Sequence, residues 1–240
     1  MEILTQQGGE FLSRWGHYLA GVTWIGLLYY FNFVQAPAFA AFEAGPRTAA
    51  TRTLVPRALW WFRWGAVATV LTGLSILAFQ DRLMDGEFYK TPAGMSISTG
   101  ILLALIMFLN VWGVIWRNQK IVIASAERTA SGGEADPAAA PAGRKGLTAS
   151  RTNTLFSIPM LFFMAATSHF APFFDQADGG QRLMYWLVVL VLVIALEAIA
   201  LMAPPAGSRL AVHLDSHRNT IVAGFVLTAI IYAVFQVVNG

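Results

Sequence analysis

The sequence predicts an all-α integral membrane protein, a polytopic helix bundle with about six transmembrane helices. Of its 240 residues, 56% are hydrophobic and only 12% are charged, and the charged share is about half that of a typical soluble domain. The mean hydropathy is +0.57, and the apolar residues come in long blocks rather than in stripes along one helix face. These features are typical of helices surrounded by lipid.

The apolar blocks have the length of membrane-spanning helices, which need about 20 residues each. We expect spans at residues 11–34, 58–79, 97–116, 153–173, 183–203 and 220–238. The segment ASGGEADPAAAPAGRKG, after the third span, is rich in alanine, glycine and proline. Residues 119–150 are therefore predicted to form a flexible cytoplasmic loop. With no internal repeat, residues 1–240 are interpreted as a single integral membrane domain.

The orientation follows from lysine and arginine, which favour cytoplasmic loops. One predicted side collects eleven basic residues: Arg47, Arg52, Arg57, Arg117, Lys120, Arg128, Arg144, Lys145, Arg151, Arg209 and Arg218. The other side collects four: Arg14, Arg82, Lys90 and Arg182. The side with eleven is predicted to be cytoplasmic. Both termini are then expected to face the periplasm, with the chain as a multi-pass protein of a bacterial inner membrane.

The composition excludes several kinds of chemistry. The chain has no cysteine, which rules out disulfides, iron–sulfur clusters and covalent haem c attachment through C-x-x-C-H within these residues. The net charge is only +3, and the basic residues lie at helix ends, so no nucleic-acid partner is expected. Residues 1–9 are polar and lack basic side chains, so no cleavable signal peptide is expected.

Two histidines lie within predicted spans. His17, in the stretch WGHYLAGVTWIGLLYYFNFVQAPAF, is about 9 Å inside the outer end of the first span by helical rise, and His169, in MAATSHFAPF, is about 6 Å inside the outer end of the fourth. Imidazoles are costly in a bilayer and are functional by default. Two of them in the same leaflet suit the axial ligation of a b-type haem. The alternative is that each one hydrogen-bonds a neighbouring helix and tightens packing.

Other polar residues also lie at membrane depth. Glu197 interrupts the apolar run LVVLVLVIALEAIALMA, and Arg63 lies near the cytoplasmic end of the second span. Glu197 is interpreted as part of a proton route, as a partner of Arg63, or as a protonated acid in an interhelical hydrogen bond. Asn110 and Asn32 are expected to make interhelical hydrogen bonds.

A last histidine pair lies in the predicted cytoplasmic loop RLAVHLDSHRN. His213 and His217 have the H-x-x-x-H spacing that places two imidazoles on one face of a helix. Because no third ligand is evident beyond Asp215, we interpret the segment as a solvated juxtamembrane loop rather than a metal site.

Three stretches together resemble the membrane domain of bacterial membrane-bound urate hydroxylases, the urate oxidase N-terminal domain. They are WGHYLAGVTWIGLLYYFNFVQ, NVWGVIWRNQK and NTLFSIPMLFFMAATSHF, in this order. In the second stretch, Arg117 replaces a proline that the family pattern W-P-N-Q-K would have. The family also leads us to expect about eight spans rather than six, and a c-type cytochrome domain of which this chain shows no sign.

The resemblance implies an oxidoreductase that oxidises urate and passes electrons toward the respiratory chain. Together with the two histidines, it predicts an electron-transfer subunit that holds haem b between His17 and His169 and uses a separate c-type cytochrome. The alternative is a non-catalytic subunit that docks onto a larger respiratory complex. A transporter built around Glu197 and Arg63 is a third hypothesis, against which the lack of a repeat counts.

Overall fold

The computed structural model describes residues 2–240, with side chains from Ile3 onward, and the described chain contains helices but no strand. The elements are η1 (Glu2–Leu4), α1 (Gln6–Tyr29), η2 (Tyr30–Gln35), α2 (Ala36–Ala41), α3 (Ala44–Phe79), η3 (Phe88–Lys90), α4 (Pro92–Leu109), η4 (Asn110–Ile115), α5 (Trp116–Ala130), α6 (Ala139–His169), η5 (Ala171–Phe173), α7 (Gly179–Met202), η6 (Val212–Leu214) and α8 (His217–Asn239). This confirms the all-α helix bundle.

Two of the long helices contain a π-helical segment without a break in the rod. The segment η2 joins α1 to α2, so one helix runs over residues 6–41, and η4 joins α4 to α5 over residues 92–130. A π segment is usually a single-turn insertion in an α-helix and is frequent at functional sites. Both segments contribute side chains to interhelical contacts: Asn32 of η2 donates to the Ser150 hydroxyl at 2.8 Å, and the contacts of Asn110 in η4 are described below.

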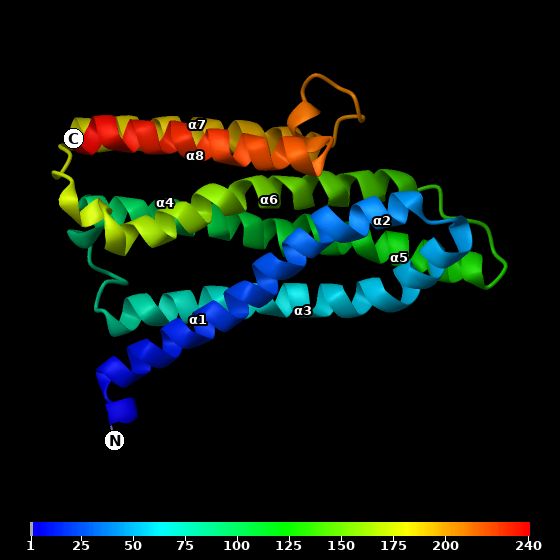
Figure 1. Cartoon of the computed structure of the whole chain (residues 1–240), viewed down its shortest axis with the longest axis horizontal. Helices are drawn as coiled ribbons and strands as arrows, with labels where there is room; N and C mark the ends of the chain where they lie inside the picture. The colour runs from blue at the N-terminus through cyan, green and yellow to red at the C-terminus, as the bar shows by residue number, and fades with distance from the viewer. Residues whose placement is uncertain (1) are drawn as a thin grey trace.

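Four helices are long and apolar enough to cross a membrane by length and composition: Ala44–Phe79, Pro92–Ala130, Gly179–Met202 and His217–Asn239. The protein is therefore a membrane protein. The first and fourth expected spans are helices too, but they are not among these four. The fourth, α6, lies in the middle of the bundle, where α4, α5, α7 and α8 pack on it (Figure 1). Because these neighbours shield it, α6 carries polar residues on its buried faces.

The helices extend beyond the expected spans, and the prediction of a flexible loop at residues 119–150 is wrong. Helix α5 continues to Ala130, α6 begins at Ala139, and only residues 131–138 connect them. Alanine, which dominates this segment, is the best helix former, and a proline such as Pro141 is tolerated in the first turn. The Ser125 hydroxyl also accepts a hydrogen bond from the Asp136 amide at 2.9 Å, which fastens the connection to α5.

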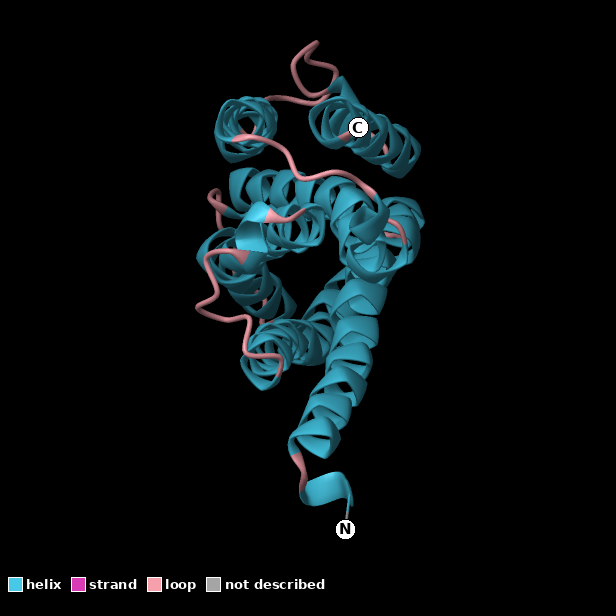
Figure 2. Cartoon of the chain, turned by 90° about the vertical axis from the view of Figure 1, so that its left-hand side faces the viewer, coloured by secondary structure: helices cyan, strands magenta, loops and turns pink. Residues whose placement is uncertain are grey.

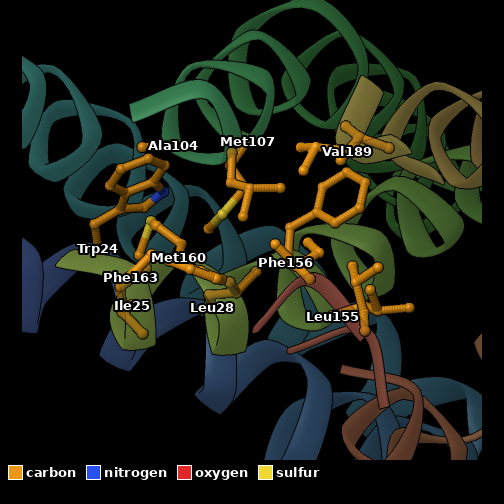
Figure 3. Close-up of a cluster of buried hydrophobic side chains, with 14 of the residues drawn as sticks. Trp24, Ile25, Leu28, Ala104, Met107, Leu155, Phe156, Met160, Phe163 and Val189 are labelled. Carbon is orange, nitrogen blue, oxygen red and sulfur yellow. The ribbon is translucent and has the colours of Figure 1, made fainter. Parts of the chain in front are cut away.

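The helices form layers. Helices α7 and α8 lie side by side on one face of the layer made by α4 and α6, while α1 crosses over α3 on the other side (Figures 1 and 2). The N- and C-termini lie at the same end of the bundle (Figure 1). The core between the layers is apolar: Trp24, Met107 and Phe163 are at most 1% exposed, and Figure 3 shows their side chains gathered there.

Candidate functional site

His17 lies against α3 in a defined tautomer. Its Nδ1 atom is 2.9 Å from the Thr69 carbonyl oxygen and 3.2 Å from the Thr72 hydroxyl. Because a carbonyl only accepts hydrogen bonds, Nδ1 carries the proton and donates it, and Nε2 keeps its lone pair. Gly73 permits this approach, since a Cβ added there would lie 3.2 Å from the His17 Cε1 atom. Small residues at helix contacts are typical of membrane bundles.

His169 is the last residue of α6, and its side chain is exposed. Its Nδ1 atom lies 2.9 Å from the carbonyl oxygen of Ala165, one turn earlier in the same helix. The same reasoning assigns the proton to Nδ1 and the lone pair to Nε2. Each of the two histidines therefore keeps its Nε2 lone pair, while a backbone carbonyl holds its other ring nitrogen.

The structure places the two histidines at the same level of the bundle but does not bring their rings together. The Tyr29 hydroxyl lies 2.9 Å from the Ser157 hydroxyl, which sets the register of α1 against α6. His17 and His169 each lie about 18 Å from this contact by helical rise, toward the end that holds the termini. At this end α1 runs beside α3, away from α6 (Figures 1 and 2).

The polar residues at membrane depth form an interhelical hydrogen-bond network. The Asn110 amide Nδ2 donates to Glu197 Oε2 at 3.0 Å and to Asn153 Oδ1 at 3.0 Å. The Asn153 amide donates in turn to the Met107 carbonyl at 2.9 Å. This confirms the interhelical role expected for Asn110 and links η4, α6 and α7.

Asn153 is the residue of this network that sequence reasoning missed. It is fully buried, with 0% of its surface exposed, although it stands at the edge of the expected fourth span. The sequence signal for it was the run of polar residues that precedes that span. These residues are compatible with a membrane bundle because neighbouring helices pack around α6 and shield it.

Of the alternatives for Glu197, the pair with Arg63 is wrong. The Arg63 guanidinium lies 3.5 Å from the ring centroid of Trp116 and 5.2 Å from that of Trp112. Its Nε donates to the Leu59 carbonyl at 3.2 Å, and it makes no ion pair with any described residue. A cation over an indole face is attracted by the ring's electrons, so the aromatic ring satisfies Arg63 in place of a carboxylate.

The His213–His217 segment is a folded connection. Within the described residues, no group of three or more His, Cys, Asp or Glu side chains is placed to hold a metal ion. Asp215, the only third ligand that the sequence offered, instead pairs with Arg144 at 3.2 Å and accepts from the Gly207 amide at 2.9 Å. Arg144 also donates to the Pro204 carbonyl, so α6 holds this connection in place.

The partial burial of His213 makes this connection sensitive to acid. Burial lowers the pKa of His213 from its usual 6.5, and the charge of Asp215 opposes this only in part. The unfolded state therefore binds the proton more readily, so the contribution of His213 to stability is present above pH 6.5 and is lost as the pH falls below it.

We expect the thermal midpoint of the purified protein to fall between pH 7.5 and pH 5.5, and to fall less in His213→Gln. Thermal unfolding in detergent at the two pH values measures this difference. An equal fall in both proteins would show that His213 is not the responsible group.

The fold and these contacts define a class: an all-helical membrane protein with a buried amide–carboxyl network and, at one end, two histidines whose Nδ1 atoms are bonded to backbone carbonyls. The family model described as urate oxidase N-terminal matches residues 83–234, more than half of the chain. The chain belongs to this family, and its function is related to that of membrane urate hydroxylases. No curated protein and no solved structure matches it. The matched region includes Asn110, His169 and Glu197, whereas His17 and Arg63 precede it.

Proposed function

We propose that this protein is the membrane subunit of a urate-oxidising system, that His17 and His169 hold a b-type haem, and that it passes electrons to a separate c-type cytochrome. Family membership supports the urate-related activity. The observation that carries the haem proposal is the shared state of the two histidines, each with Nδ1 hydrogen-bonded to a backbone carbonyl at 2.9 Å.

This arrangement fits the chemistry of axial ligation. Metal-binding histidines almost always donate their other ring N–H to a carbonyl, a carboxylate or water, which fixes the ring and raises its basicity. The Thr69 carbonyl does this for His17 and the Ala165 carbonyl for His169. Because the structure does not bring the two rings together, a haem held by both histidines would require the first half of α1 to lie closer to the end of α6 than it does here (Figures 1 and 2). When bound, a b-type haem supplies one-electron transfer.

The position of the histidines suits a partner outside the membrane. His17 lies in the first half of α1 and His169 is the last residue of α6, and these parts of the two helices lie at the end of the bundle that holds the termini (Figure 1). The excess of lysine and arginine at the other end favours a cytoplasmic location there. In a bacterial inner membrane, the histidines would then lie near the periplasmic face, where soluble c-type cytochromes work.

Urate-dependent reduction of a c-type cytochrome tests this function. Membranes that contain the protein are mixed with urate and oxidised cytochrome c, and the cytochrome absorbance is followed. We expect reduction that depends on urate and that His17→Ala removes. If neither urate nor the histidine affects the rate, the protein is an accessory subunit rather than the electron-transfer unit.

A further inference from the structure

The positive charge of Arg63 has no carboxylate to pair with. Helix α3 carries no acidic residue, and neither does the rod of α4, η4 and α5 before Glu127. Both helices are among the four that are long and apolar enough to cross a membrane. A charged side chain at membrane depth is costly. The contact with Trp116 lowers this cost, but it leaves the charge uncompensated.

A second cation meets the same tryptophan. The Lys120 Nζ atom lies 5.7 Å from the ring centroid of Trp116, and the Arg63 guanidinium lies 3.5 Å from it. Lys120 makes no ion pair with any described residue either. One indole ring therefore holds a cation from each of two helices. The two cations repel each other, and an anion that reached both of them would relieve this repulsion.

The N–H groups of these cations are open to the surroundings. The Arg63 Nε is taken by the Leu59 carbonyl, but the two terminal nitrogens make no hydrogen bond within the described residues. They are also not among the buried atoms that lack a partner, and Lys120 is exposed. A guanidinium binds two oxygens of one phosphate through its fork, and an ammonium adds a point charge. The pair is therefore suited to a phosphate group.

Exposed apolar side chains continue from the cations along both helices. Trp64 and Leu71 of α3 are 47% and 58% exposed, and Leu105 and Leu109 of α4 are 44% and 66% exposed. The rings of Trp64 and Trp112 have centroids 5.8 Å apart, which joins the two rows of side chains. A free phosphate ion would leave this surface uncovered, whereas the acyl chains of a lipid would cover it.

The two cations lie where the helices change from apolar to basic. Arg57 is about 9 Å along α3 from Arg63 by helical rise, and Arg117 directly follows Trp116. Tryptophans gather beside the cations, as is typical of the headgroup level of a bilayer: Trp60, Trp61, Trp64, Trp112 and Trp116. A lipid phosphate lies at the same level.

We propose that Arg63 and Lys120 bind the phosphate of an anionic membrane lipid, whose acyl chains lie on the exposed apolar side chains of α3 and α4. A zwitterionic lipid fits less well, because its own ammonium competes for the phosphate charge. Basic sites between transmembrane helices are a usual place for anionic headgroups. The proposal does not depend on haem at His17 and His169.

Thermal unfolding of the purified full-length protein in detergent tests the site, because a bound ligand raises the midpoint. Dioleoylphosphatidylglycerol is expected to raise it, and dioleoylphosphatidylcholine and inorganic phosphate are not. An equal rise with both lipids would overturn the proposal, and so would a rise with phosphate alone. A dimer that Trp61→Ala separates, with no response to phosphatidylglycerol, would assign this face to a second copy of the chain and overturn it as well.

Three variants, compared by the phosphatidylglycerol concentration that gives half of the midpoint rise, locate the binding. Arg63→Gln is expected to weaken binding about tenfold, the scale of a hydrogen bond to a charged group. Lys120→Gln, at an exposed position, is expected to weaken it about threefold. The control is Arg57→Gln, which removes the same charge from α3 but loses only a bond to the Thr53 carbonyl of its own helix, and it should bind like the wild type.

The outcome is decided by the comparison with this control. Weaker binding in Arg63→Gln and Lys120→Gln, with Arg57→Gln unchanged, supports the site. If Arg63→Gln does not fold, Lys120→Gln decides alone, because its exposed side chain has no described hydrogen bond to lose. Unchanged binding in Lys120→Gln, or an equal loss in Arg57→Gln, would contradict the proposal.

Discussion

Replacing either His17 or His169 by alanine is expected to abolish the b-type haem spectrum of the purified protein. Each imidazole has only Nε2 available as a ligand, because Nδ1 is committed to a backbone carbonyl. Without one imidazole, a bound haem would keep its porphyrin nitrogens but lose one of the two histidines that would hold it, and its low-spin reduced spectrum would disappear even if some haem remained associated. The reduced-minus-oxidised difference spectrum of each variant measures the effect.

Two controls make this result specific. His213→Ala removes a histidine from the connection at the other end of the bundle and should keep the full haem signal. Ser168→Ala removes a hydroxyl that lies 3.4 Å from the His169 Nδ1 atom and should change it little, because the Ala165 carbonyl still holds the ring. An unchanged spectrum in both histidine-to-alanine variants would refute the assignment of the ligands.

Replacing Asn153 by leucine is expected to lower the stability of the bundle by about 1–3 kcal/mol, the usual cost of a buried polar group left unpaired. Leucine cannot accept the hydrogen bond from Asn110, and it leaves the Met107 carbonyl without its 2.9 Å donor. The change therefore disturbs two helices at once. Chemical or thermal unfolding in detergent, followed by circular dichroism, measures the loss.

Glu197→Gln is the matched comparison for Asn153→Leu. Glutamine still offers an oxygen to the Asn110 amide, so the network keeps its connectivity and the stability should stay close to that of the wild type. If Asn153→Leu unfolds at the same point as the wild type, the network does not hold the helices together. If Glu197→Gln lowers the stability more than Asn153→Leu does, the negative charge of the Glu197 carboxylate contributes to stability. The network is then more than an interhelical hydrogen-bond contact.

The sequence was sufficient to predict an all-α membrane protein, because the length of each apolar segment is set by the thickness of the bilayer and not by the details of helix packing. It was also sufficient for the role of Asn110, since an amide in a span has few partners besides another helix. It failed at residues 119–150, where glycine and proline suggested a linker. In this segment, the helix propensity of alanine and the packing of α5 against α6 outweigh the helix-breaking tendency of glycine and proline.

The partners of the polar side chains depended on the tertiary structure. Glu197 and Arg63 have opposite charges, yet Arg63 lies over the Trp116 ring while Glu197 meets Asn110. The tryptophan was visible in the sequence, but its distance from Arg63 was not. The π segments were equally hidden, because a change of hydrogen-bond register leaves no clear residue pattern.

The most direct test of the proposed electron-transfer role is the absorption spectrum of the purified wild-type protein in detergent, reduced minus oxidised, with the haem extracted and identified as its pyridine complex. The account predicts a b-type signal at about one haem per chain, as expected for a single site with two histidine ligands. A featureless spectrum from folded protein supplied with haem during expression would contradict it.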